Sequence, residues 1–166
     1  MEKYREYLFD TCRRIFAVDS PSGYTTKVMK LICEMAEEMG YSFELTKKGC
    51  GIITIPGHRE EKTVALSAHV DTLGLMVRSI TSDGQLKFTP VGGPLLPTLD
   101  GEYCTIYTRS GKTYTGTILS LSPAIHVYAD SKSRERDADN MAVRIDEKVK
   151  SMTYYFHNCY FVRYFI

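Results

Sequence analysis

The chain has 166 residues, of which 43% are hydrophobic and 25% are charged, and its formal net charge is +1. These values suit one globular domain, or one domain and part of a second, and they argue against a disordered or collagen-like chain. The near balance of 21 basic and 20 acidic residues gives no electrostatic reason to expect nucleic acid or an anionic membrane as a partner.

Two amphipathic helices are predicted first along the chain. Apolar residues recur every three or four positions over residues 2–16 and 25–39, with charged residues between them. Residues 20–23, Ser-Pro-Ser-Gly, are typical of a turn that separates the two helices. Cys12 and Cys33 lie on the apolar helix faces, so we expect both to be small buried hydrophobic residues.

Strands are predicted after the second helix. Residues 41–46 and 51–55 each have the alternation or the β-branched content of a strand. Residues 63–68 are small, apolar and almost uncharged, which indicates a central strand with both faces covered. Helices followed by such strands predict an α/β fold built in layers.

From about residue 73 the pattern changes to short strands separated by glycine-containing turns. Such regular spacing without helices is typical of a small β-barrel or sandwich. A dense run of both charges over residues 130–139 predicts a solvated loop. The expected strands cover residues 75–80, 86–89, 103–108, 114–119 and 141–145.

His69 and Asp71 follow directly on the predicted central strand. Residues two apart in an extended backbone point the same way, so both side chains can face one site. The carboxyl end of a strand is where open α/β sheets bind ligands, and a histidine that ligates zinc needs an acceptor for its other ring nitrogen. The same pattern also fits a structural histidine that is hydrogen-bonded at a strand end.

Three motifs occur in order: SPSGY at residues 20–24, AHVDTLGLMV at 68–77 and VGG at 91–93. Together they resemble the N-terminal part of the tetrahedral-type dinuclear metalloaminopeptidases, the glutamyl and deblocking aminopeptidase group, some of whose members have been labelled endoglucanases. The resemblance extends from about residue 4 to about residue 151. It implies a zinc-peptidase-like α/β/α domain with a small β-barrel domain inserted after the His-x-Asp strand.

The resemblance also implies the domain boundaries and the reaction. Residues 1–72 would be the first part of the peptidase domain, and residues 73–150 an inserted and incomplete β-barrel. His69 would ligate one of two divalent metal ions, zinc or cobalt, and Asp71 would be its supporting carboxylate. The substrate would be a peptide, from which the enzyme releases the N-terminal amino acid, and the enzyme would form a large homo-oligomer.

The family's other metal ligands and its catalytic glutamate are expected after the inserted domain, and no motif in this sequence supplies them. We therefore expect a truncated chain without peptidase activity of its own.

The compartment and membrane relations follow from simple counts. No run of 18 apolar residues predicts a transmembrane helix, and the charged N-terminus lacks the apolar stretch of a secretion signal. The five cysteines form no Cys-x-x-Cys pair, which argues against a zinc ribbon or a redox pair. Reduced thiols in the cytoplasm are the expected state.

The last 15 residues hold seven of the 19 aromatic side chains and one clear charge, Arg163. They show neither clean helical nor clean strand periodicity. We interpret residues 151–166 as an aberrant aromatic tail, such as a frameshift or a gene-model error would produce. The alternative is a genuine aromatic strand that packs on the barrel.

Two other functions are alternatives to the aminopeptidase. The barrel region could form a non-catalytic oligomerisation or interaction module. A glycoside hydrolase would need two suitably placed carboxylic residues, and nothing in the sequence singles out such a pair.

Overall fold

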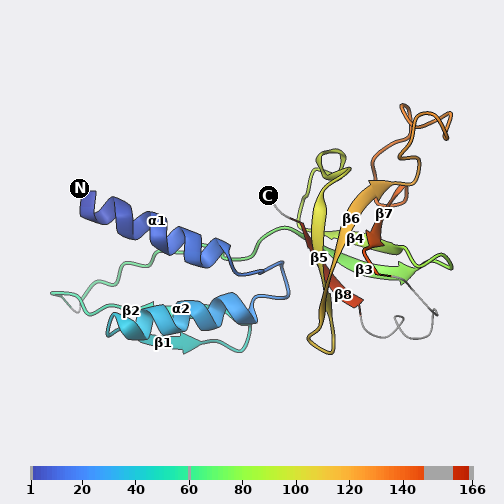
Figure 1. Ribbon diagram of the computed structural model, residues 1–166. Coiled ribbons are helices and arrows are strands. Elements are labelled where there is room, and N and C mark those ends of the chain that lie inside the picture. Colours follow the sequence, from blue (N-terminus) through green and yellow to red (C-terminus); the bar gives the residue numbers. More distant parts are fainter. Residues whose placement is uncertain (1, 60, 148–158, 165–166) are drawn as a thin grey trace. The chain divides into compact units, whose positions relative to one another are not determined.

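The computed structural model describes residues 2–59, 61–147 and 159–164. The chain divides into two compact units, Met1–Thr72 and Leu73–Ile166. The first unit contains the helices and one hairpin, and the second contains a β-barrel (Figure 1). None of the described helices has the length and apolar character needed to cross a membrane.

The first unit packs a helix against a hairpin. Its elements are α1 (Glu2–Phe16), α2 (Thr26–Glu38), β1 (Ser42–Leu45) and β2 (Gly51–Thr54). The strands β1 and β2 pair antiparallel, and α2 contacts both of them and α1. Val28 and Ala36 of α2 are fully buried, as the apolar stripe predicted.

The cysteines of the two helices are less buried than expected. Cys12 and Cys33 are both only partly covered. The reason at Cys12 is that α1 has no fully buried side chain, since only one neighbouring helix contacts it.

Residues 63–68 do not form the predicted central strand. Leu66 is 97% exposed and Val64 is 86% exposed, and the segment has no strand pairing. A strand needs neighbours for its backbone N–H and C=O groups, and the sheet described in this unit contains only β1 and β2, paired with each other. The segment is apolar, as predicted, but the described residues do not include the layers that would cover a central strand.

The second unit is a closed antiparallel barrel. Its strands are β3 (Gly74–Ile80), β4 (Leu86–Val91), β5 (Tyr103–Thr108), β6 (Thr113–Ser120), β7 (Met141–Ile145) and β8 (Cys159–Tyr164), and a short 3₁₀ helix, η1 (Leu96–Leu99), connects β4 to β5. Around the barrel the order is β3-β4-β7-β6-β5-β8. The five strands predicted in this region are all present, with bounds that differ by at most two residues.

The barrel core consists of inward-facing apolar side chains from every strand. Successive strand residues point to opposite faces, so alternate positions fill the interior. Burial of this apolar surface is the main source of the barrel's stability. The residues of the core with no exposed surface are Leu75, Leu86, Phe88, Ile106, Ile118, Met141, Val143 and Val162.

Residues 159–164, interpreted first as part of an aberrant tail, form the strand β8, as the alternative of an aromatic strand packed on the barrel predicts; the expectation of an incomplete barrel is wrong. In the structure β8 pairs antiparallel with β5 and with β3 and so closes the barrel. Val162 faces the core, and the edges of β5 and β3 gain hydrogen-bond partners that a missing strand would leave unpaired. Residues 151–158 and 165–166 of the expected tail lie outside the described residues, and the frameshift origin stays a hypothesis.

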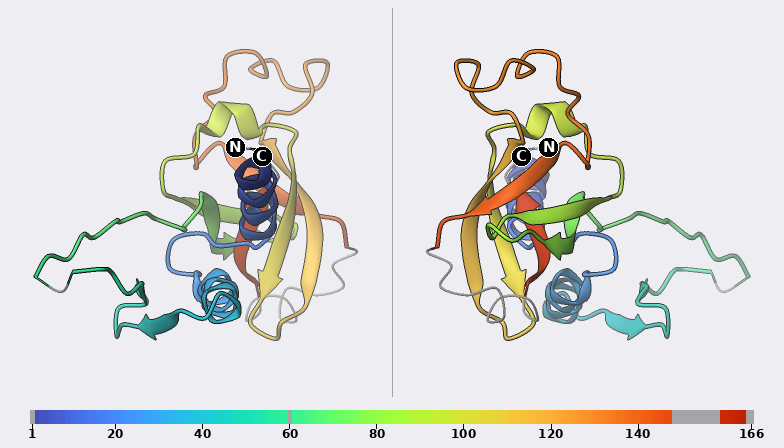
Figure 2. Two further views of the ribbon diagram at one scale, coloured as in Figure 1. Left: turned by 90° about the vertical axis from the view of Figure 1, so that its left-hand side faces the viewer. Right: turned by 90° about the vertical axis from the view of Figure 1, so that its right-hand side faces the viewer.

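The charged segment 130–139 belongs to a long connection between β6 and β7 at one end of the barrel (Figure 2). It is a loop, as predicted, and several of its charged side chains have hydrogen-bond partners. Arg134 binds Asp130 at 2.6 Å, and the Nε of Arg136 binds the carboxylate of Asp100 at 3.0 Å. Ser122, which is fully buried, donates to Asp130 at 2.9 Å. An ion pair within the loop and another to Asp100 therefore stabilise the conformation of the loop.

Candidate functional site

The segment that carries His69 and Asp71 is attached to the turn between α1 and α2. Thr72 forms an isolated parallel bridge with Pro21, and its N–H donates to the carbonyl oxygen of Ser20 at 2.8 Å. The Ser20 hydroxyl donates to the carbonyl oxygen of Val70 at 2.9 Å. Ser20 is 1% exposed, so these contacts form a buried anchor for the backbone next to His69.

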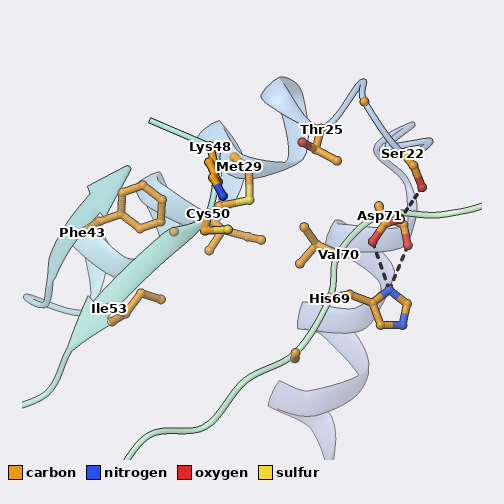
Figure 3. Close-up of a pocket in the computed structure, with 15 residues that line it drawn as sticks. Ser22, Thr25, Met29, Phe43, Lys48, Cys50, Ile53, His69, Val70 and Asp71 are labelled. Atoms are coloured by element: carbon orange, nitrogen blue, oxygen red, sulfur yellow. Dashed lines mark hydrogen bonds and ion pairs between the residues drawn. The ribbon is translucent and has the colours of Figure 1, made fainter. Parts of the chain in front are cut away.

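The imidazole of His69 is held by two oxygens of Asp71 (Figure 3). Its Nδ1 lies 3.1 Å from the backbone carbonyl oxygen and 3.3 Å from the carboxylate Oδ1. Both oxygens only accept hydrogen bonds, so the neutral imidazole that satisfies them carries its proton on Nδ1. The lone pair is then on Nε2, and this ring nitrogen could ligate a metal ion.

The carboxylate of Asp71 has its own partner on its second oxygen. The Ser22 hydroxyl donates to Oδ2, and this hydrogen bond is the main cause that holds the pKa of Asp71 below its ordinary value. Partial burial opposes the shift, while the backbone N–H of Asp71 and the nearby His69 support it. Asp71 is therefore ionised at neutral pH, the state in which it accepts from an imidazole best.

These polar groups line one side of an open cavity of about 420 Å³ in the first unit. Figure 3 shows the apolar side chains of α2, β1 and β2 on its other side. Its wall thus combines an apolar surface with a few convergent polar groups, which is typical of small-molecule and peptide sites. The labelled lining residues are Ser22, Thr25, Met29, Phe43, Lys48, Cys50, Ile53, His69, Val70 and Asp71.

As a metal site, this arrangement is suitable but incomplete. A catalytic zinc ion usually takes three protein ligands, and each ligating histidine is held through its other nitrogen. His69 fits the role of one such ligand, and Asp71 fits the role of the group that holds it. Over residues 2–59, 61–147 and 159–164, no three His, Cys, Asp or Glu side chains gather where they could share a metal ion.

The spacing of His69 and Asp71 predicts their proximity, but it does not predict the contribution of the turn. Ser20 and Ser22 were interpreted only as turn residues, yet each contacts the segment around Asp71. A signal was available, because the SPSG motif and the His-x-Asp motif belong to the same resemblance. Residue spacing alone could not reveal contacts between positions about 50 residues apart.

Comparisons with known proteins give a consistent result. The model of the family "M42 glutamyl aminopeptidase" matches residues 49–154. The protein named "Putative aminopeptidase YhfE" of Bacillus subtilis is 42% identical over 137 residues, which are 82% of this chain and 40% of that protein. The lysyl aminopeptidase of Pyrococcus furiosus is 30% identical over 131 residues, 77% of this chain and 37% of its own length. The chain thus spans about two fifths of these relatives.

Solved structures share the fold. The aminopeptidase APDkam598 of the archaeon Desulfurococcus kamchatkensis superposes with a TM-score of 0.81 at 19% identity, covering 97% of this chain and 44% of that one. The TET1 peptidase of Pyrococcus horikoshii gives a TM-score of 0.72 at 20% identity, covering 94% of this chain and 46% of that one. The expected fold class, part of such an α/β domain with a small β-barrel, is confirmed.

Proposed function

Because the chain belongs to the M42 glutamyl aminopeptidase family, we propose that it supplies a histidine ligand and part of the substrate cavity to a metal-dependent aminopeptidase. The observation that carries this proposal is the geometry at His69, whose Nδ1 lies 3.1 Å and 3.3 Å from two oxygens of Asp71, which leaves Nε2 as the ring nitrogen that could bind a metal ion. The cavity beside it has room for a short peptide end. The names of the related aminopeptidases support a peptide with an accessible N-terminus as the substrate class.

The metal content that we propose is two divalent ions, zinc or cobalt. When bound, such a pair polarises the scissile carbonyl and activates a water molecule. His69 would bind one ion through Nε2, and the Asp71 carboxylate would fix the ring rather than bind the metal. The described residues do not bring three His, Cys, Asp or Glu side chains together at one place, so His69 lacks partner ligands among them in this arrangement.

The same shortage of ligands predicts that the chain alone has no peptidase activity. The test is the release of p-nitroaniline from aminoacyl-p-nitroanilides by the purified chain with added zinc or cobalt. We expect the rate to equal that of a His69→Ala variant purified in the same way. Metal-dependent release by the wild-type chain that the variant lacks would contradict this expectation.

The proposed assembly and compartment follow the relatives and the cysteines. The Pyrococcus horikoshii TET1 peptidase assembles into a tetrahedron or a large octahedral shell, which supports a homo-oligomer for this chain as well. The described cysteines, Cys12, Cys33, Cys50 and Cys104, are free thiols, in keeping with the reducing cytoplasm that we propose. The charge balance supports neither nucleic acid nor a membrane as a partner.

The closed barrel favours a second candidate function, a non-catalytic oligomerisation or interaction module. The barrel has its own core and no open sheet edge between its described strands, so it does not need the first unit to bury its apolar residues. Light scattering after gel filtration, combined with a zinc titration of the wild type and His69→Ala, separates the two functions. A defined oligomer that binds no zinc would favour the module, whereas tight stoichiometric zinc that depends on His69 would favour the peptidase.

A further inference from the structure

The turn between the two helices reaches the His-x-Asp segment at two levels. Ser20 anchors the backbone, through its hydroxyl to Val70 and through its carbonyl oxygen to Thr72. Ser22 instead donates to the side chain of Asp71. Ser20 therefore fixes the backbone of this segment, whereas Ser22 contacts the Asp71 carboxylate, although the two serines are only two residues apart.

The two carboxylate oxygens of Asp71 are used by different partners. Oδ2 accepts from Ser22, and Oδ1 lies 3.3 Å from Nδ1 of His69. Fixing one oxygen of a planar carboxylate also restricts where the other oxygen lies. The Asp71 side chain is 40% exposed, so water competes for both oxygens and a second anchor is needed to keep Oδ1 facing the imidazole.

We propose that Ser22 is a positioning residue, which orients the Asp71 carboxylate so that His69 keeps its proton on Nδ1 and its lone pair on Nε2. This inference rests on the proposed function, in which Nε2 binds a metal ion. It makes the SPSG turn a part of the metal site rather than only a connection between helices. The relay runs from the Ser22 hydroxyl through both carboxylate oxygens to the imidazole.

The size of the effect is limited by the second acceptor. The backbone oxygen of Asp71, 3.1 Å from Nδ1, remains in place when the Ser22 hydroxyl is removed, so the preference for the Nδ1 proton weakens without vanishing. The Ser22–Asp71 hydrogen bond forms with either tautomer of His69, whose side chain is 86% exposed, so its removal changes the ratio by at most the about fivefold that a whole hydrogen bond is worth. Any residue that keeps a hydroxyl at position 22 should preserve the ratio, and an alkyl group should not.

The test is a nuclear magnetic resonance measurement on the ¹⁵N-labelled, metal-free full chain. Two-bond ¹H–¹⁵N correlations report which ring nitrogen of each neutral imidazole carries the proton. The chain has four histidines, so the His69 signals are assigned by their loss in a His69→Gln variant. The measurement compares the wild type with Ser22→Ala, Ser22→Thr and the matched control Ser20→Ala.

We expect Ser22→Ala to lower the ratio of the Nδ1–H to the Nε2–H form of His69 by more than about twofold and by no more than the about fivefold that one whole hydrogen bond would produce. Ser22→Thr should stay within about twofold of the wild type, because its hydroxyl still donates. Ser20→Ala should lower the ratio less than Ser22→Ala does, since the Ser20 hydroxyl binds a backbone oxygen and not the Asp71 carboxylate. Equal ratios in Ser22→Ala and the wild type would overturn the inference, and so would equal losses in the two alanine variants.

Two further measurements keep the test decisive. If the amide spectrum shows that Ser22→Ala is unfolded, Asp71→Asn with Ser22 intact takes its place, and an unchanged His69 ratio there would overturn the relay. Excess Co²⁺ tests the proposed function separately, because a bound ion broadens the His69 signals. If Co²⁺ does not broaden the His69 signals while the tautomer ratio of His69 still depends on Ser22, the metal role is refuted and the positioning role of Ser22 is retained.

Discussion

Shortening the buried side chain of β8 should loosen the barrel at a seam that can be measured. Val162 has no exposed surface and lies opposite Ile106 of β5 and Leu75 of β3, both of which are also fully buried. Val162→Ala removes the equivalent of two CH₂ groups, worth ~1.6 kcal/mol, and the remaining cavity raises the loss to about 2 kcal/mol.

The thiol of Cys104 reports on this seam directly. Cys104 lies in β5 opposite Tyr164 of β8, is 1% exposed, and burial raises its pKa to about 12. It therefore reacts with iodoacetamide only after the barrel opens. A loss of about 2 kcal/mol should speed its labelling about 25-fold, because each 1.4 kcal/mol is a factor of ten.

Peptide mass spectrometry distinguishes Cys104 from the other cysteines and gives the rate. The matched control is Val127→Ala in the loop between β6 and β7, where the side chain is 74% exposed. We expect Cys104 in the Val127→Ala control to be labelled at a rate within about twofold of the wild-type rate, because substitutions of exposed side chains change stability little. Equal rates in Val162→Ala and the control would refute the reasoning and would return residues 159–164 to the status of an aberrant tail.

Three further predictions concern exposure, the ordered loop and pH. Leu66→Ala should change the free energy of unfolding by less than about 0.5 kcal/mol, since Leu66 is 97% exposed. Leu75→Ala, at a fully buried site, should lower the free energy of unfolding by about 3 kcal/mol. Equal losses for the two variants in urea titrations would contradict this. Arg136→Ala should speed proteolysis of residues 121–140 several-fold, because its guanidinium holds two loop carbonyls and the carboxylate that follows η1, and Arg136→Lys should not restore resistance, since lysine lacks the planar fork. Hydrogen bonds from Arg134, and then from Ser122, lower the pKa of Asp130, so its contribution to stability is present above about pH 4 and is lost as the pH falls through the lowered pKa. The difference in urea midpoint between the wild type and Asp130→Asn should therefore shrink from pH 6 to pH 3, and a constant difference would argue against this ion pair.

The elements that the sequence predicted well are those whose signals are local. The helix periods of α1 and α2 and the alternation of β3 to β7 come from neighbouring residues, and glycines mark several of the turns. Gly84 and Gly111 have φ of 86° and 82°, a left-handed conformation that favours glycine, at the turns after β3 and β5.

The failures arise where structure depends on partners far along the chain. Residues 63–68 are apolar enough for a central strand, but a strand exists only where neighbours complete its hydrogen bonds. The opposite holds for β8, whose aromatic composition hid a strand that pairing with β5 and β3 stabilises.

The candidate site divides in the same way. The two-residue spacing of His69 and Asp71 predicts that their side chains lie together, and the distance of 3.3 Å between Nδ1 and the carboxylate Oδ1 agrees with that prediction. The contact between Ser22 and Asp71 joins positions 49 residues apart, so only the folded chain reveals it. The metal role of His69 remains a proposal.

A chimera tests that role most directly. Residues 1–147 of this chain would be fused to Bacillus subtilis YhfE from the position that aligns with residue 148, which restores the length of a relative that is 42% identical and replaces β8 with that relative's own sequence. We predict metal-dependent release of amino acids from aminoacyl-p-nitroanilides, and a loss of at least about 100-fold in the His69→Ala chimera, since a lost metal ligand should cost no less than a lost outer-shell partner. Equal activity of the two chimeras would contradict the assignment of His69 as a metal ligand.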